Sequence, residues 1–179
     1  MMMPAELLIL LPALIGLGVL LLLRRRRQSA RPDPVIHGPA IPRHAIVVDG
    51  SNVMHWGGAA SAKVLALVLR ALQAKGYAPI VIFDASAGYR LADRYLDASA
   101  LSPLIGLPAA QVSVVDKGVI ADSAILRFAA QHRLRIVSND LYRDWRVQFP
   151  HLRRKGAVLR GRYDAGAVVW NARLKPVRA

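Results

Sequence analysis

Hydrophobic positions in the C-terminal three quarters of the chain gather into four short runs separated by longer mixed segments. The runs are Ala45–Val48, Ile80–Phe83, Val112–Val115 and Leu134–Val137, and all four are rich in Val and Ile. Largely apolar runs of this length, without alternation of polar residues, are typical of strands that are buried on both faces. The pattern therefore predicts a central parallel β-sheet.

The segments between these runs carry helical signals. Residues 61–75 begin with Ser61, a common N-cap residue, and are followed by Gly76, which is favoured just after a helix. Residues 122–131 also read as a helix with an acidic first turn, whereas residues 91–101 have weaker helical spacing. Strand and helix thus alternate four times, which indicates a doubly wound α/β domain.

The end of the chain predicts one further β element. Residues 157–170 read either as a last strand or as a hairpin, with Gly161 and Gly166 near its turns. No internal repeat is visible in the sequence.

An uncharged stretch, Leu7–Leu23, precedes the α/β region and is nearly long enough to cross a hydrocarbon core of about 30 Å. No Lys or Arg comes before it, and four arginines (Arg24–Arg27) follow it, which is the reverse of a cleaved signal peptide. We therefore expect residues 1–27 to be a single-pass transmembrane anchor with a basic stop, its apolar part at residues 4–23. The positive-inside rule places the N-terminus outside and the rest in the cytoplasm, at the inner membrane.

The region after the anchor divides into a tether and a folded domain. Residues 28–43 contain four prolines and a glycine, which favours an extended linker. Residues 44–179 then form the α/β domain. The expected fold is therefore a three-layer α/β domain with a central parallel sheet, preceded by one transmembrane helix.

Composition changes this picture in two ways. The chain has no cysteine, which excludes disulfides, thiolate nucleophiles and cysteine-ligated zinc. The formal net charge is +14, and from Gln131 to Ala179 there are 12 Lys+Arg against 3 Asp+Glu. A basic excess confined to one part of a domain attracts polyanions, although a solvated basic surface is the plainer alternative.

Polar residues with ligating oxygens follow each apolar run, at the sheet edge where doubly wound folds bind ligands. They are Asp49 and Asn52 after the first run, Asp84 after the second, Asp116 after the third, and Ser138, Asn139, Asp140 and Asp144 after the fourth, with Asp122 opening the third helix. Clustered carboxylates repel one another unless a cation joins them. Mg²⁺ prefers such hard oxygen ligands, and Mn²⁺ is the alternative, so the pattern predicts a metal site for phosphoryl chemistry.

Several of these residues also have plainer explanations. Asp49 before Gly-Ser-Asn suits a turn, Asp116 reads as a turn residue, and Asp122 and Asp140 suit the first turns of helices. On a helix beginning near residue 140, Asp140 and Asp144 would share a face. Asn52 would orient a water or a phosphate oxygen, and nearby cationic side chains would hold neighbouring phosphates; these are Arg143, Arg146, Arg153, Arg154 and Lys155.

Three segments resemble the NYN ribonucleases of the PIN-like superfamily, and the Regnase branch with CCCH zinc fingers above all. They are VVDGSNVMH (47–55), ADSAILRFA (121–129) and IVSNDLYRDW (136–145). The resemblance implies a PIN-like, Rossmannoid fold and Mg²⁺-dependent endonuclease cleavage of single-stranded RNA, here in a membrane-anchored bacterial form. It also implies that Asp49, Asn52, Asp122, Asp140 and Asp144 are catalytic, and that the four acids hold the metal. Asp84 and Ser138 are secondary candidates.

One departure from that branch bears on activity. Where the branch has two adjacent acids at the start of the third helix, this chain has Ala121 followed by Asp122. The alternative to a nuclease is therefore an RNA-binding or scaffold module of the same fold with weak or no turnover. Two other functions are disfavoured. A haloacid dehalogenase-type phosphatase needs an acid at the position of Ser51, and a dinucleotide-binding enzyme needs a G-x-G-x-x-G motif, which does not follow the first strand.

Overall fold

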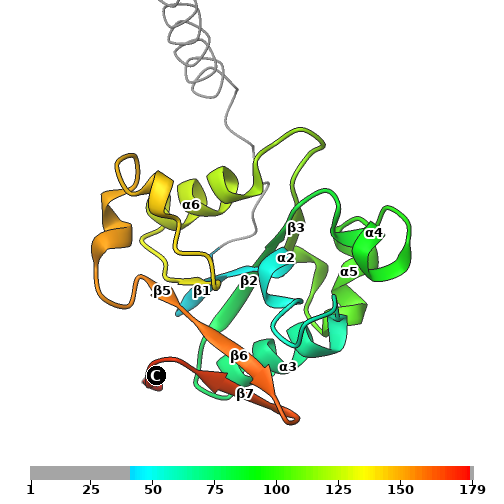
Figure 1. The fold of residues 1–179 in the computed structure, drawn as a ribbon, viewed down its shortest axis with the longest axis horizontal. Helices are drawn as coiled ribbons and strands as arrows, with labels where there is room; N and C mark the ends of the chain where they lie inside the picture. The colour runs from blue at the N-terminus through cyan, green and yellow to red at the C-terminus, as the bar shows by residue number, and fades with distance from the viewer. Residues whose placement is uncertain (1–40, 178–179) are drawn as a thin grey trace, which may run out of the picture. The chain divides into compact units, whose positions relative to one another are not determined.

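The structure is a computed structural model that describes residues 41–177 of the chain. Five parallel strands form its central sheet in the order β3-β2-β1-β4-β5 (Figure 1). The strands are β1 (Ala45–Asp49), β2 (Ala78–Phe83), β3 (Val112–Val114), β4 (Ile136–Val137) and β5 (Val158–Leu159). The four apolar runs therefore form strands β1 to β4, as predicted, and the parallel sheet is confirmed.

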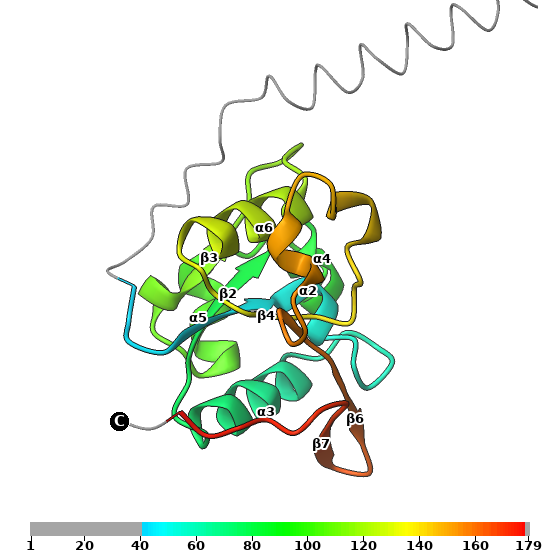
Figure 2. The same cartoon turned by 90° about the vertical axis from the view of Figure 1, so that its left-hand side faces the viewer.

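Helices cover both faces of this sheet, as the two perpendicular views show (Figures 1 and 2). Helix α6 lies over one face, and α3 lies over the other. The helices are α2 (Gly50–Val53), α3 (Ala62–Gln73), α4 (Ala87–Ala92), α5 (Ala98–Ile105) and α6 (Ala121–Gln131), with 3-10 turns η1 (Ala109–Gln111), η2 (Arg143–Trp145) and η3 (Pro150–Arg153). The three-layer arrangement is the one expected from the sequence.

Two hydrophobic cores result from the alternation of side chains along each strand. Ile46 and Val48 of β1 point into the core shared with α3 and α5. Val47, between them, points into the core shared with α6. Because β1 is central and fully buried on both faces, it needs the uninterrupted apolar run seen in the sequence.

Helix α3 begins and ends as its sequence signals predict. The Ser61 side chain accepts a hydrogen bond from the backbone N of Val64 at 3.3 Å, and Gly76 adopts a left-handed conformation (φ 85°) just past the helix.

The prediction of a single weak helix at residues 91–101 is wrong, because two helices meet in this segment. Helix α4 ends before Asp93, which is in the left-handed region (φ 57°). Helix α5 begins after Asp97, whose side chain accepts a hydrogen bond from the backbone N of Ala100 at 2.8 Å.

The C-terminal segment forms both a last strand of the sheet and a hairpin, which the sequence offered as alternatives. After β5, strands β6 (Gly161–Asp164) and β7 (Ala167–Trp170) form an antiparallel hairpin. Its turn is Ala165–Gly166, where both φ angles are positive (46° and 87°), as a tight two-residue hairpin turn requires. Gly161 is not at a turn but opens β6, opposite Trp170.

The predicted anchor and most of the predicted tether lie outside the described residues. Between residues 41 and 177, no helix is long and apolar enough to cross a membrane.

Candidate active site

Asp49 ends the central strand β1 and is the most deeply buried carboxylate of the predicted site, with 6% of its surface exposed. Its Oδ1 accepts a hydrogen bond from the backbone N of Asn52 at 3.0 Å, so Asp49 caps α2. Its Oδ2 accepts from the hydroxyls of Ser138 at 2.9 Å and Tyr142 at 3.1 Å. Burial raises the pKa of Asp49 above its usual value despite these donors, and the charge of Asp140 adds to the effect.

The segment after β4 places Ser138 and Asp140 beside Asp49. The Ser138 hydroxyl accepts from the backbone N of Asp140 at 3.1 Å, and Asp140 Oδ1 accepts from the backbone N of Tyr142. These local bonds hold an irregular loop, and Tyr142 is in the left-handed region (φ 46°). The helix expected to begin near residue 140 is therefore wrong, and Asp140 and Asp144 do not share a helix face.

Asp122, in the first turn of α6, faces the other carboxylates. Its pKa is raised to about 6, first by burial and then by the negative charges of Asp49, Asp140 and Asp84. Three acids from three other segments thus lie within electrostatic reach of Asp122, at the carboxyl end of the sheet. Asp144 is exposed on η2 and is not among the charges that raise the pKa of Asp122.

Asp84, which follows β2, is held by local hydrogen bonds. Its Oδ1 accepts from the backbone N and the hydroxyl of Ser86 at 2.7 and 2.6 Å, and its own backbone N donates to Ser51 Oγ at 2.9 Å. Burial raises the pKa of Asp84, but the hydrogen bonds from Ser86 and Ser51 and the charge of Arg90 outweigh it, so the pKa is lowered. Asp84 therefore adds a firmly ionised charge to the cluster.

Asn52 joins α2 to the loop after β4. Its Oδ1 accepts from the indole Nε1 of Trp56 at 3.2 Å and from the backbone N of Asn139 at 2.8 Å. Both bonds go to the oxygen, which leaves the amide nitrogen Nδ2 as the group with which Asn52 can reach a ligand.

Two residues to which the sequence analysis gave no role help to organise the site. Tyr142 is 1% exposed, and burial raises the pKa of its hydroxyl, which therefore stays protonated and donates to Asp49. Asn139 clamps the hairpin, because its Nδ2 donates to Gly161 O at 2.8 Å and its Oδ1 accepts from Gly161 N at 3.2 Å. Both residues belong to the S-N-D-x-Y motif, which marks them in the sequence. Their contacts with Asp49 and Gly161, however, are visible only in the folded structure.

The cluster fits a hard divalent cation in charge and in donor chemistry. Within residues 41–177, no group of three or more His, Asp or Glu side chains lies ready to ligate one ion together. Mg²⁺, however, is usually bound through one or two carboxylates, with water and substrate phosphates completing its shell. The mutual repulsion felt at Asp122 is the property that a bound cation would relieve.

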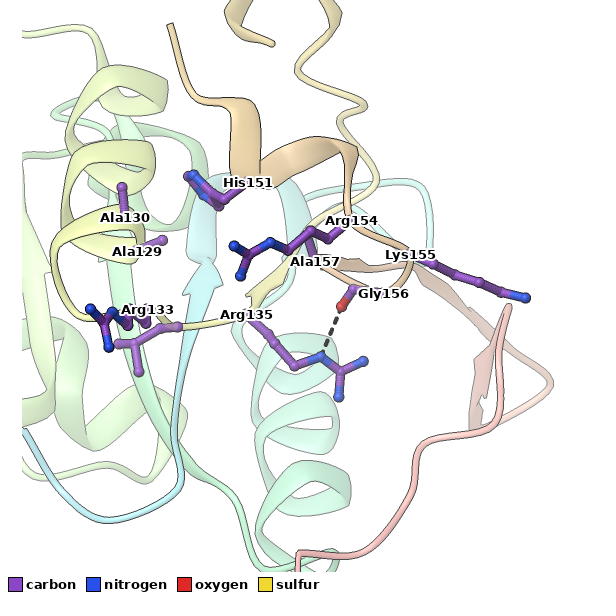
Figure 3. Close-up of a pocket in the computed structure, with 10 residues that line it drawn as sticks. Ala129, Ala130, Arg133, Arg135, His151, Arg154, Lys155, Gly156 and Ala157 are labelled. Carbon is purple, nitrogen blue, oxygen red and sulfur yellow. Dashed lines mark hydrogen bonds between the residues drawn. The ribbon is translucent and has the colours of Figure 1, made fainter.

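The five predicted RNA-binding residues divide into two groups. Arg143 is exposed on η2, and Arg146 directs its Nη2 toward Leu141 O at 3.5 Å, while its Nε is buried with no hydrogen-bond partner in the part of the chain described. Arg153 is exposed on η3. Arg154 and Lys155, in contrast, line a pocket formed with residues that precede β4 and β5 (Figure 3). They are therefore at the opposite end of these strands from the carboxylates.

No curated protein matches the chain. Two solved structures of nuclear protein-only RNase P 2 (PRORP2) from A. thaliana have similar folds, each with a TM-score of 0.55. One is 16% identical and covers 75% of this chain and 30% of PRORP2, and the other is 17% identical and covers 94% and 36%. This chain thus spans about a third of PRORP2, and the likeness indicates a shared fold.

The family comparison is more specific. Residues 42–159, which are more than half of the chain, match the family described as the Zc3h12a-like ribonuclease NYN domain. The match begins just before β1 and ends with β5, so it contains all the carboxylates of the candidate site and leaves out the hairpin β6–β7. The chain therefore belongs to the Zc3h12a-like ribonuclease NYN domain family.

Proposed function

We propose that this protein is a membrane-anchored, Mg²⁺-dependent endoribonuclease that hydrolyses phosphodiester bonds of single-stranded RNA at the carboxyl edge of its sheet. The observation that carries the proposal is the electrostatic coupling of Asp122 with Asp49, Asp84 and Asp140. The three carboxylates gathered around Asp122 disfavour its ionisation, so this part of the arrangement works against the stability of the fold. Their arrangement is suited to a site that a divalent cation and a phosphodiester complete.

Within this proposal, Asp49, Asp122 and Asp140 hold the cation, and the exposed Asp144 acts through water. Bound Mg²⁺ would supply an activated water and would neutralise charge on the phosphodiester. The chain's contribution is rigid placement of the Asp49 carboxylate, whose two oxygens are held by Asn52 N, Ser138 Oγ and Tyr142 Oη. A carboxylate fixed by three donors is already oriented before substrate arrives.

The neighbouring donors suit an RNA backbone. Arg146 has a buried Nε without a partner among residues 41–177, and such a nitrogen is costly unless a ligand or water accepts its proton. Arg143 adds an exposed guanidinium from the same short turn. Guanidinium groups bind phosphate oxygens in a bidentate manner, and Asn52 Nδ2 supplies a further neutral donor nearby.

The second candidate function is an RNA-binding module with little or no turnover. Two observations favour it: Ala121 stands where the Regnase branch has an acid, and the described residues contain no ready three-ligand metal group. Such a module would bind RNA with a strong salt dependence but would not cleave it when Mg²⁺ is added.

The test is cleavage of an end-labelled, unstructured RNA by the full chain in mild detergent, with Mg²⁺, with Mn²⁺ and with EDTA. We expect internal cleavage that needs the metal and is lost in Asp140→Asn, a change at an exposed side chain that keeps an Oδ1 acceptor for the backbone N of Tyr142. Asp116→Asn is the matched control, because Asp116 is also exposed but is not among the charges that raise the pKa of Asp122 or Asp49. Salt-sensitive binding without cleavage would select the second candidate, and equal activity in Asp140→Asn would refute the proposed site.

Single-stranded DNA and duplex RNA of the same sequence serve as competing substrates. We expect faster cleavage of the single-stranded RNA. The predicted anchor is tested separately, by the distribution of the full chain and of residues 41–179 between membrane and soluble fractions.

A further inference from the structure

A second group of cationic side chains surrounds a pocket of about 500 Å³ at the other end of β4 and β5. The pocket is formed by the C-terminal end of α6, the residues that precede β4 and β5, and η3 (Figure 3). We name it the basic pocket after its polar lining residues, which are Arg133, Arg135, His151, Arg154 and Lys155. Among residues 41–177, no acidic side chain lines it.

The basic pocket is separate from the carboxylate site. Arg135 precedes the two-residue strand β4, and Ser138 follows it. Three residues of extended chain span about 10 Å. A ligand in the basic pocket therefore does not have to occupy the carboxylate site.

One wall of the pocket is fixed before any ligand binds. Arg135 donates from Nε to Gly156 O at 2.8 Å and from Nη1 to the Tyr77 hydroxyl at 3.1 Å, which ties β4 to the chain leading into β5. At the end of α6, Leu134 N bonds to Ala129 O at 2.8 Å in a Schellman-type ending. That motif puts Arg133 in the left-handed region (φ 54°), a position usually occupied by glycine.

The opposite wall of the pocket carries the side chains of His151 and Arg154. His151 and Arg154 extend from the η3 segment toward α6, whereas Lys155 extends away (Figure 3). The Nε2 atom of His151 is buried and has no hydrogen-bond partner among residues 41–177. Burial and the charge of Arg154 lower the pKa of His151, so its imidazole is neutral at pH 7 and can donate or accept one hydrogen bond.

We propose that the basic pocket binds a nucleotide through its phosphate group. The Arg154 guanidinium, which extends toward α6, supplies positive charge and paired donors for the phosphate, Arg133 supplies a second positive charge from the α6 side, and His151 Nε2 supplies a neutral contact. The apolar wall, formed by Ala129, Ala130 and Leu134, suits a base or ribose. The volume lies in the range of small-molecule sites. The phosphate belongs either to a free mononucleotide or to the phosphorylated end of an RNA strand.

The experiment measures binding to the full chain in EDTA, so that cleavage does not interfere. Calorimetry with AMP, adenosine and inorganic phosphate identifies the group that is recognised. A short RNA with a 5′-phosphate, compared with its 5′-hydroxyl form, separates the two sources. We expect AMP or the phosphorylated RNA to bind and adenosine to bind at least 10-fold more weakly, because the phosphate carries the interaction.

Variants locate the ligand. Arg154→Ala and Arg133→Ala remove exposed side chains and should each weaken binding about 10- to 100-fold, the loss expected for one charge-assisted contact. Arg94→Ala removes the same charge from the exposed α4–α5 connection and should change nothing. Asp140→Asn should retain binding even if it abolishes cleavage, so the failure of one proposal is distinguishable from the failure of the other. The inference is overturned if no phosphate-bearing probe binds, or if binding is equal in Arg154→Ala and Arg94→Ala.

Discussion

Replacing Asp122 by Asn should stabilise the metal-free protein and at the same time abolish cleavage. Asp122 is partly buried, and in the folded state the charges of Asp49, Asp140 and Asp84 oppose its ionisation. An amide of nearly the same size cannot ionise, so it escapes this repulsion. If the carboxylates are gathered for a cation, Asp122 lowers the stability of the metal-free protein, as functional residues often do.

The magnitude follows from the shift in the pKa of Asp122. A rise from 3.8 to about 6 corresponds to about 3 kcal/mol of lost stability when the group is ionised. Solvent screening of this partly exposed group reduces the value to roughly 1–2 kcal/mol. Loss of a carboxylate from the first turn of α6 costs about 0.3–1 kcal/mol through the helix dipole. We therefore expect Asp122→Asn to gain about 1 kcal/mol.

The pH dependence of stability tests independently whether Asp122→Asn stabilises the protein for the reason given. Because the pKa of Asp122 is raised in the folded state, folding binds its proton, and the destabilisation is small near pH 4 and complete above about pH 6.5. The advantage of Asp122→Asn should therefore be small at pH 4 and largest at pH 7.5. Added Mg²⁺ at pH 7.5 should stabilise the wild type more than the variant.

The assay is urea unfolding followed by tryptophan fluorescence at pH 4.0, 6.0 and 7.5, in EDTA and in Mg²⁺. Asp116→Asn, which removes an exposed acid at the end of β3, is the control for a general change in net charge. The reasoning is refuted if Asp122→Asn at pH 7.5 in EDTA is no more stable than Asp116→Asn, or if its advantage is the same at pH 4.0.

Three further outcomes follow from single contacts. Tyr142→Phe removes the hydroxyl that donates to Asp49, a hydrogen bond that lowers the pKa of this carboxyl, so the pKa of Asp49 should rise further. The acid limb of the kcat/KM profile should then move to higher pH, and an unmoved limb would contradict this. Asn139→Ala removes both hydrogen bonds to Gly161 and should lower the free energy of unfolding by about 1–3 kcal/mol in urea titrations. A loss below about 0.5 kcal/mol would mean that these two hydrogen bonds are unimportant for stability. Gly161→Ala would bring a Cβ within 2.7 Å of the Trp56 ring and 2.8 Å of Val169 O, so we expect about 1–3 kcal/mol of destabilisation and a changed tryptophan spectrum, and a wild-type spectrum would count against the packing described.

Local signals predicted elements well where one signal dominated. The buried run of β1 and the Ser61 cap with Gly76 at the ends of α3 were each read correctly. The failures came where side chains compete with the backbone for hydrogen bonds. Asp97 restarts a helix inside the expected 91–101 segment, and the Ser138 and Asp140 bonds hold a loop where a helix was expected.

By itself, the sequence determined that acids follow successive buried strands, because apolar runs and the residues after them are local features. Parallel strands bring such residues to one edge, so the convergence of Asp49, Asp84, Asp122 and Asp140 was predictable. Only the tertiary structure decided that Asp144 is on a short 3-10 turn and not on a helix with Asp140, that Tyr142 reaches Asp49 across 93 residues, and that Arg154 turns to the opposite end of β4. The reason is physical: spacing along a chain specifies which face or edge a residue occupies, whereas the direction of its side chain depends on packing with segments far away in the sequence.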